Sequence, residues 1–262
     1  MDAPKIESTS NAPQPESRQA SGPIRKVALA LERSIFTLGK HWLFAFNLFL
    51  AIYVGVPFLA PVFMRLGWPV PAWVIYTLYS PLCNQWAHHS WFVFGARSYY
   101  PSAVFQAYTG INPDTLEGIL AARAFVGNAL MGYKVAICER DVAIYGTMLL
   151  CGLVYGIPAA RRRVGPLPWQ AWFLIGIVPI GIDGFWQLFT TFPFTAVFPA
   201  LNQLPHHESS PFWRSLTGGL FGLANIWLAY PHFEASMREA HAELKVRLAH
   251  VDSEAPQPRL KP

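Results

Sequence analysis

A short polar cluster stands directly before a long apolar run, in the stretch KVAICERDVAIYG at residues 134 to 146. It brings a thiol, a cation and a carboxylate together within four residues, Cys138, Arg140 and Asp141. A second cysteine, Cys83, opens the stretch CNQWAHH further upstream. These groups could form a disulfide, hold a soft metal ion or exchange protons with a substrate, so their chemistry could be redox, metal-dependent or acid–base.

Another ionisable residue, Asp183, lies inside the apolar segment PIGIDGFWQLF, one helical turn before Gln187. A charge within a membrane span is costly in lipid and therefore faces the bundle interior or a wet cavity. Arg140 and Arg214 are its candidate partners. Two interpretations stay open, a functional site or a buried ion pair that only fixes helix docking. The candidate catalytic residues are Asp183, Asp141, Arg140, Gln187 and Arg214.

The cysteines allow three interpretations. We favour a disulfide between Cys83 and Cys138, which is typical of an oxidising compartment. The alternative is a metal site, with zinc as the cofactor, in which these two thiolates are joined by His88 and His206. The third interpretation is a pair of inert buried thiols. The histidines belong to the pairs HHS at 88–90 and HHES at 206–209, which also suit solvated loops.

The elements that position these residues are apolar segments long enough to cross a bilayer. Only 13% of the 262 residues are charged and 53% are hydrophobic, against roughly 25% charged in soluble domains. We predict an all-α, polytopic membrane protein with four transmembrane helices. Their predicted ranges are Leu43–Phe63, Val142–Pro158, Trp169–Phe189 and Phe212–Tyr230. The Pro-rich block Trp68–Leu82 is predicted to be a re-entrant or interfacial helix, or alternatively a fifth span.

The basic residues predict the orientation, because short cytoplasmic loops collect Lys and Arg. Basic residues precede the first span, form RRR at 161–163 and follow the last span. Four crossings place all three groups in the cytoplasm, whereas five would separate the first two. We therefore predict an inner (plasma) membrane protein with both termini cytoplasmic. The predicted parts are a disordered tail (1–40), a membrane domain (41–232) and a cytoplasmic C-terminal helix and tail (233–262).

This topology places the loops 64–141 and 190–211 outside and the loop 159–168 in the cytoplasm. Both cysteines, the histidine pairs and the outer end of the third span then share one membrane face. The small residues of CGLVYG (Gly152, Gly156) and GGLFG (Gly218, Gly222) predict that the second and fourth spans touch.

The chain also resembles a known family. The stretches CNQ at 83–85, MGYKVAICERDVAIYG at 131–146, IDGFWQ at 182–187 and RSLTGGLFG at 214–222 are similar to prokaryotic membrane proteins grouped as domain of unknown function 2085. The likeness covers about residues 75 to 225. The resemblance implies a polar site with Cys138, Arg140, Asp141 and Asp183, but no established activity. Asn84 stands where the family carries a histidine, which weakens a metal role for Cys83.

Several function classes are excluded or disfavoured. The sequence contains no P-loop, nucleophile elbow, HExxH motif or dinucleotide fingerprint. Its net charge of +5 sits at the ends of apolar blocks, so we expect the lipid bilayer as partner and no nucleic acid. Three hypotheses remain: a membrane enzyme acting on an amphiphilic or lipid-linked substrate, an assembly subunit of a membrane complex, or a small carrier. The absence of a repeat in the sequence disfavours the carrier.

Overall fold

The computed structural model describes residues 27, 34, 39–191 and 194–254. The chain divides into two compact units, one formed by residues 41–240 and the other by the two terminal regions, 1–40 and 241–262. Most of the predicted N-terminal tail and the last eight residues lie outside the described residues. The account below concerns residues 41–240, which carry all candidate site residues.

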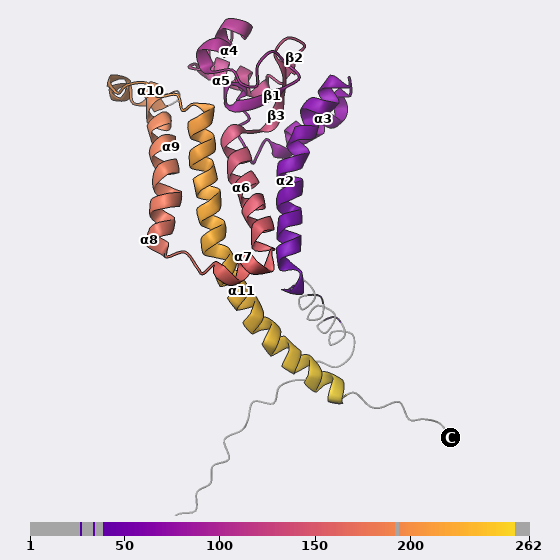
Figure 1. Ribbon diagram of the computed structural model, residues 1–262. Coiled ribbons are helices and arrows are strands. Elements are labelled where there is room, and N and C mark those ends of the chain that lie inside the picture. The colour runs from indigo at the N-terminus through magenta and orange to yellow at the C-terminus, as the bar shows by residue number, and fades with distance from the viewer. Residues whose placement is uncertain (1–26, 28–33, 35–38, 192–193, 255–262) are drawn as a thin grey trace, which may run out of the picture. The chain divides into compact units, whose positions relative to one another are not determined.

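Four long helical segments lie side by side in this unit (Figure 1). They are α2 (Trp42–Arg65), α6 (Glu139–Tyr155), the run α8 (Trp169–Trp172), η2 (Phe173–Ile177) and α9 (Val178–Thr190), and the part of α11 (Pro211–Glu254) up to residue 240. The predicted apolar ranges fall within these helices almost completely. The main difference lies in the second segment, where α6 begins three residues before Val142 and so includes Glu139, Arg140 and Asp141.

Two helical segments among the described residues are long and apolar enough to cross a membrane, Trp42–Arg65 and Trp169–Thr190. Their most apolar windows have mean hydropathies of 2.1 and 1.5, and only 17% and 11% of those windows are buried. A core helix of a soluble protein would be mostly buried. Exposed apolar side chains such as Phe49, Ile52, Ile182 and Phe185 instead cover their outward surfaces.

Close packing joins α6 to α11, as the small-residue pattern predicts. A Cβ atom on Gly218 would lie 2.9 Å from the carbonyl oxygen of Arg140, and one on Gly222 would collide with the carbonyl of Ile144. The glycines therefore let the two backbones approach. Gly152 serves a different contact, since a side chain there would collide with Asn47 of α2.

The prediction of an all-α fold is wrong in one region, because the long loop before α6 contains a small antiparallel sheet. Its strands are β1 (Ser90–Val93), β2 (Gly127–Asn128) and β3 (Gly132–Cys138), in the order β1-β3-β2. Ser90 pairs with Cys138, and Val93 pairs with Tyr133. The β1–β3 pairing joins residues 40 to 48 positions apart, which a periodicity within one segment does not reveal.

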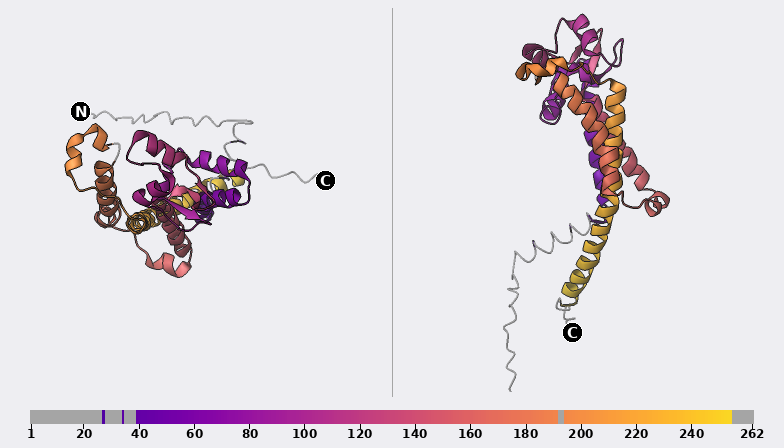
Figure 2. Two further views of the ribbon diagram at one scale, coloured as in Figure 1. Left: turned by 90° about the horizontal axis from the view of Figure 1, so that it is seen from above. Right: turned by 90° about the vertical axis from the view of Figure 1, so that its left-hand side faces the viewer.

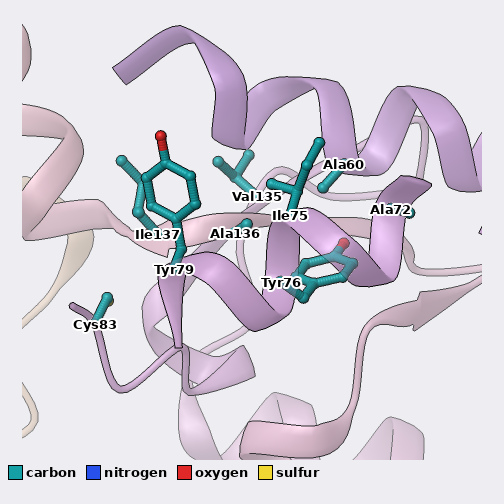
Figure 3. Packing of buried hydrophobic residues seen from close by; sticks show 9 residues of the cluster. All are labelled: Ala60, Ala72, Ile75, Tyr76, Tyr79, Cys83, Val135, Ala136 and Ile137. Carbon is teal, nitrogen blue, oxygen red and sulfur yellow. The ribbon is translucent and has the colours of Figure 1, made fainter. Parts of the chain in front are cut away.

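The block after the first long helix forms α3 (Pro69–Tyr79), which packs on both α2 and β3. Figure 3 shows this cluster, in which Ala60 of α2 and Ala72, Ile75, Tyr76 and Tyr79 of α3 meet Val135, Ala136 and Ile137 of β3. A second core joins the 3-10 turn η1 (Ala87–His89), α4 (Ser102–Thr109) and α5 (Leu116–Ala124) to β1.

The segments that connect the long helices gather at the two opposite ends of those helices (Figures 1 and 2). The sheet end contains residues 80–138 and 194–210, including α10 (Phe194–Val197) and the 3-10 helix η3 (Pro199–Gln203). The α7 end contains residues 156–168, including α7 (Pro158–Arg163) with its three arginines. All predicted site residues therefore lie at the sheet end, away from the RRR run.

Candidate functional site

A cavity of about 390 Å³ lies at the sheet end, among the α3–η1 connection, the start of α6, α9 and α11. Its polar lining is Asn84, Gln85, His89, Cys138, Arg140, Asp141, Gln187 and Arg214, together with Cys83. Pro81, Leu82 and Leu188 add apolar walls. The cavity therefore joins thiol, carboxylate, amide, imidazole and guanidinium groups from segments that are up to 130 residues apart in the chain.

Asp183 is buried beside this cavity and has three polar partners. The Arg140 guanidinium donates to its Oδ2 at 2.6 Å, and the Ser209 hydroxyl donates to the same oxygen at 2.8 Å. His207 Nε2 lies 3.4 Å from Oδ1. Of the two candidate partners for Asp183, Arg140 makes the contact and Arg214 does not. This network ties α9 to the start of α6 and to the loop before α11.

A second ion pair lies deeper, between Arg214 of α11 and Glu139 of α6. The Arg214 Nη1 atom donates to Glu139 Oε2 at 3.2 Å, and the two side chains are only 3% and 0% exposed. The sequence interpretation overlooked Glu139 as a site residue, although it belongs to the same polar cluster as Arg140. The sequence feature that could have identified Glu139 is its position directly before the apolar run, where the helix begins.

Cys83 and Cys138 lie side by side at the cavity wall, and both are free thiols in the structure. The backbone N–H of Cys138 donates to Cys83 Sγ at 3.2 Å, and the N–H of Asp141 donates to Cys138 Sγ at 3.5 Å. The side-chain hydrogen bond with Cys83, followed by burial, raises the pKa of Cys138 well above its ordinary value. Cys138 also occupies the N-cap position of α6.

The comparisons with known proteins agree with the membrane character of the helices. A family model described as "Predicted membrane protein (DUF2085)" matches residues 121–228. The uncharacterized protein MJ1492 of Methanocaldococcus jannaschii is 34% identical over 200 residues, which cover 74% of this chain and 93% of the relative. The chain belongs to the DUF2085 family of predicted membrane proteins. No solved structure matches the chain.

The DUF2085 match contains most of the cavity residues, including Cys138, Arg140, Asp141, Asp183 and Arg214. It begins after Cys83 and the two histidines of η1, so the N-terminal wall of the cavity lies outside the matched range. Neither the family description nor the relative's name states an activity. The resemblance found in the sequence is thus confirmed as membership of a family of predicted membrane proteins.

The histidines of this family member do not join the cysteines. His88 is buried, its ring stacks on Trp86, and burial lowers its pKa to about 3. Burial likewise lowers the pKa of His89 well below its ordinary value, and its Nε2 lies 3.1 Å from the Gln187 amide. His206 Nδ1 lies 3.1 Å from the carbonyl oxygen of Thr190. The ligand-type group nearest to the two thiols is instead the carboxylate of Asp141.

Lys134 is bonded to Gln85 of the cavity lining, and the sequence did not predict it as a site residue. Its fully buried ammonium donates to the carbonyl oxygens of Gln85 at 2.7 Å and Arg123 at 2.6 Å. Burial, with a smaller contribution from the charge of Arg123, lowers the pKa of Lys134 to about 7. Gln85 has a positive φ of 54°, and its amide donates to the carbonyls of Tyr76 and Ala136. These bonds hold a strained residue in place.

Proposed function

We propose that the chain is a multi-pass protein with four membrane spans, formed by α2, α6, α8–α9 and the first part of α11. A span requires roughly 17 to 25 residues. Helix α6 has 17 residues and the other three are longer. Helix α3 has only 11 residues, about 16 Å at 1.5 Å per residue, so it folds back as a non-spanning helix.

The distribution of charge supports an inner-membrane orientation with the sheet end outside. The RRR run lies at the α7 end, and the predicted cytoplasmic termini carry further basic residues. In this arrangement 41–232 is the membrane domain, with 64–141 and 190–211 outside and 159–168 inside. The terminal regions 1–40 and 233–262 are then cytoplasmic.

Reporter fusions test this topology. Fusions after Arg163 and at the C-terminus are expected to report cytoplasm, and fusions near Asn112 and Gln203 are expected to report the outside. A cytoplasmic signal at Asn112 would show that the two loops of the sheet end do not share the outer side.

The cavity is, in our proposal, a binding site for an amphiphilic molecule with an anionic head group. The observation that carries it is unused donor capacity at two arginines of the cavity. Arg140 Nε and Arg214 Nη2 are buried and have no hydrogen-bond partner, although each arginine already contacts one carboxylate. A buried, unpaired donor is costly, so an anion that these arginine side chains turn to meet in the cavity would recover that cost. Leu82 and Leu188 offer apolar contacts to the rest of such a molecule.

We favour an enzyme that acts on this amphiphilic or lipid-linked molecule. Asp141 is the better candidate for the acid or base, because it lines the cavity and no ion pair engages its carboxylate among the described residues. Asp183 is held by Arg140 and Ser209 and so orients Arg140. Gln187, whose amide contacts His89, contributes a polar wall.

An assembly subunit of a membrane complex is the second candidate. It is favoured by apolar residues exposed on the sheet end, outside the proposed spans, where lipid tails would not cover them. Leu116, Leu120 and Leu130 are 64%, 58% and 64% exposed. A small carrier that uses Asp183 as its coupling site is the third candidate.

Binding of anionic amphiphiles to the purified protein tests the proposal. An anionic amphiphile is expected to bind the native chain more tightly than an uncharged one of equal chain length. The substitution Arg140→Gln should weaken anion binding about tenfold, the equivalent of roughly 1.4 kcal/mol. Arg163→Gln at the α7 end is the matched control and should leave binding unchanged. Equal binding by the native chain and the Arg140 variant would contradict the site.

A further inference from the structure

The two cysteines and Asp141 form a compact group of three potential metal ligands. One ligand atom from each, the Sγ atoms of Cys83 and Cys138 and a carboxylate oxygen of Asp141, all lie within 4.8 Å of one another. Three different positions hold them, the loop after α3, the end of β3 and the first turn of α6. All three residues line the cavity, so a ligand from the cavity can reach the same point.

The surroundings of the sulfur atoms suit bound thiolates. Each sulfur accepts a backbone N–H, from Cys138 at 3.2 Å and from Asp141 at 3.5 Å. Hydrogen bonds of this kind orient metal ligands and stabilise their charge. Asp141 has no ion-pair partner within the described part of the chain, even though Arg140 and Arg214 line the same cavity. Those arginines are paired with Asp183 and Glu139, so no cation of the described residues forms an ion pair with the Asp141 carboxylate.

We propose that Cys83, Cys138 and Asp141 bind a soft divalent cation, zinc foremost, and that the cavity provides its fourth ligand. Zinc–sulfur bonds of about 2.3 Å in a tetrahedral shell place two sulfurs about 3.8 Å apart. The observed ligand atoms all lie within 4.8 Å of one another, which is compatible with that spacing. Three protein ligands with one open position are the pattern of zinc sites that bind water or substrate, whereas closed structural sites use four.

A disulfide would explain less of this arrangement. It would use the two thiols but give no role to Asp141. The backbone N–H groups that each donate to one sulfur would also stabilise a neutral disulfide less than a pair of thiolates. The metal uses all three residues and neutralises a charge that burial would otherwise oppose. His88 and His206 are not needed, since Trp86 stacks on the first and the carbonyl of Thr190 lies beside the second.

This inference rests on the proposed function in taking the cavity as the working site. When bound, the cation would supply a Lewis acid at the cavity wall. The residues of the chain would have separate tasks. Asp141 and the thiols would hold the ion, a role that replaces the acid or base role proposed for Asp141 above, and the free donors of Arg140 and Arg214 would bind the anionic part of the ligand.

Metal content of the purified full chain is the first test. Protein prepared with zinc and then passed through a desalting column is expected to retain about one zinc ion per chain. Cys83→Ser and Cys138→Ser should each lose the ion, and Asp141→Asn should weaken its retention at least tenfold. Cys151→Ser is the matched control, because Cys151 lies within α6, packs near Tyr155 and Tyr230, and does not line the cavity. It should keep the full metal content.

Thiol labelling of the native chain gives a test that does not depend on whether a substituted protein folds. Zinc should slow alkylation of Cys83 and Cys138, and a chelator should restore it, while labelling of Cys151 does not respond. Cobalt in place of zinc should give thiolate-to-metal absorption that weakens when either cysteine is replaced. A native protein that retains no zinc, or whose never-reduced form carries a Cys83–Cys138 disulfide, would overturn the metal site. Binding of anionic amphiphiles that still depends on Arg140 would show that only the metal inference had failed.

Discussion

Two buried carboxylates at opposite ends of the helices have similar hydrogen-bond partners but different surroundings. Asp183 at the sheet end accepts hydrogen bonds from Arg140 at 2.6 Å and Ser209 at 2.8 Å. Glu234, on α11 near α7, accepts them from Arg161 at 2.6 Å and from the Tyr155 hydroxyl at 2.7 Å. Each carboxylate therefore has one arginine and one hydroxyl group on a single oxygen.

The two carboxylates differ in whether the polar groups around them have hydrogen-bond partners. Arg238 occupies the second oxygen of Glu234 at 3.3 Å, and the side chains of Arg161 and Arg238 are 36% and 76% exposed to solvent. Burial would raise the pKa of Glu234, but the hydrogen bonds and charges of its partners outweigh it and lower that pKa. The cluster around Glu234 is satisfied by its own residues, with water able to reach both arginines.

Around Asp183, in contrast, several polar atoms are buried without a partner. They are Glu139 Oε1, Arg140 Nε and Arg214 Nη2. Two further unpartnered atoms, Asn47 Oδ1 and Tyr230 Oη, lie beside Gly152 and away from the cavity, and neither belongs to a charged group. Buried polar groups are normally satisfied, so the unpartnered guanidinium and carboxylate atoms beside the cavity distinguish a site prepared for a ligand from a structural tie. A buried ion pair alone therefore does not mark function. The unused hydrogen-bonding capacity around it does.

The largest effect is expected at the pair between Glu139 and Arg214. Glu139→Gln leaves the Arg214 charge buried and uncompensated, so the free energy of unfolding should fall by about 3–5 kcal/mol. Adding Arg214→Met should restore much of the loss, because the penalty comes from the unpaired charge. Unfolding in detergent, followed by temperature or denaturant, measures both variants. A double variant no more stable than Glu139→Gln alone would show that the pair is not the source of the loss.

A pH dependence is expected from Lys134, a buried cation at the same end. Its pKa falls from 10.5 in the unfolded chain to about 7 in the fold, mainly because of burial. Between these pH values the unfolded chain binds more protons, so the free energy of unfolding rises with pH. The slope is at most about 1.4 kcal/mol per pH unit. Lys134→Met should flatten that rise, as unfolding measured between pH 7 and pH 10.5 would reveal. An unchanged slope would contradict the assignment.

Asp183→Asn should have a smaller effect than Glu139→Gln. Arg140 lies at the cavity and is 23% exposed, so water can partly solvate it once Asp183 loses its charge. A loss of about 1–3 kcal/mol in the free energy of unfolding is expected, the range for an unsatisfied buried polar group. If Asp183 also positions Arg140 for an anionic ligand, binding of the anionic amphiphile should weaken in a variant that remains folded. A folded variant with native binding would remove Asp183 from the site.

Much of this arrangement could be predicted from single segments. The apolar ranges, the short helix within the block at Trp68–Leu82 and the glycine contact between α6 and α11 follow from composition and spacing within each segment. The role of Cys138, Arg140 and Asp141 as the start of a helix follows from their place before an apolar run. These features depend on local sequence, where periodicity is informative.

The remaining features depend on contacts between distant segments. To predict the sheet, one would need to know that Ser90 pairs with Cys138. To choose Arg140 over Arg214 as the partner of Asp183, one would need to know how α6 is rotated relative to α9. The buried position of Lys134 is the clearest example. Its partners are two backbone carbonyls, at Gln85 and Arg123, which leave no mark in the amino-acid sequence.

The smallest effect is expected at the α7 end, with Glu234→Gln. Glutamine keeps an acceptor for the Tyr155 hydroxyl, and Arg161 and Arg238 can turn to water because both are exposed. The free energy of unfolding should therefore fall by less than about 1 kcal/mol, as for exposed ion pairs. Glu239→Gln, on the exposed surface of the same helix, is the matched control and should cause no measurable change. A loss at Glu234 equal to that at Glu139 would mean that burial of the carboxylate, and not the solvation of its arginines, decides the cost. The contrast between the two ends would then fail.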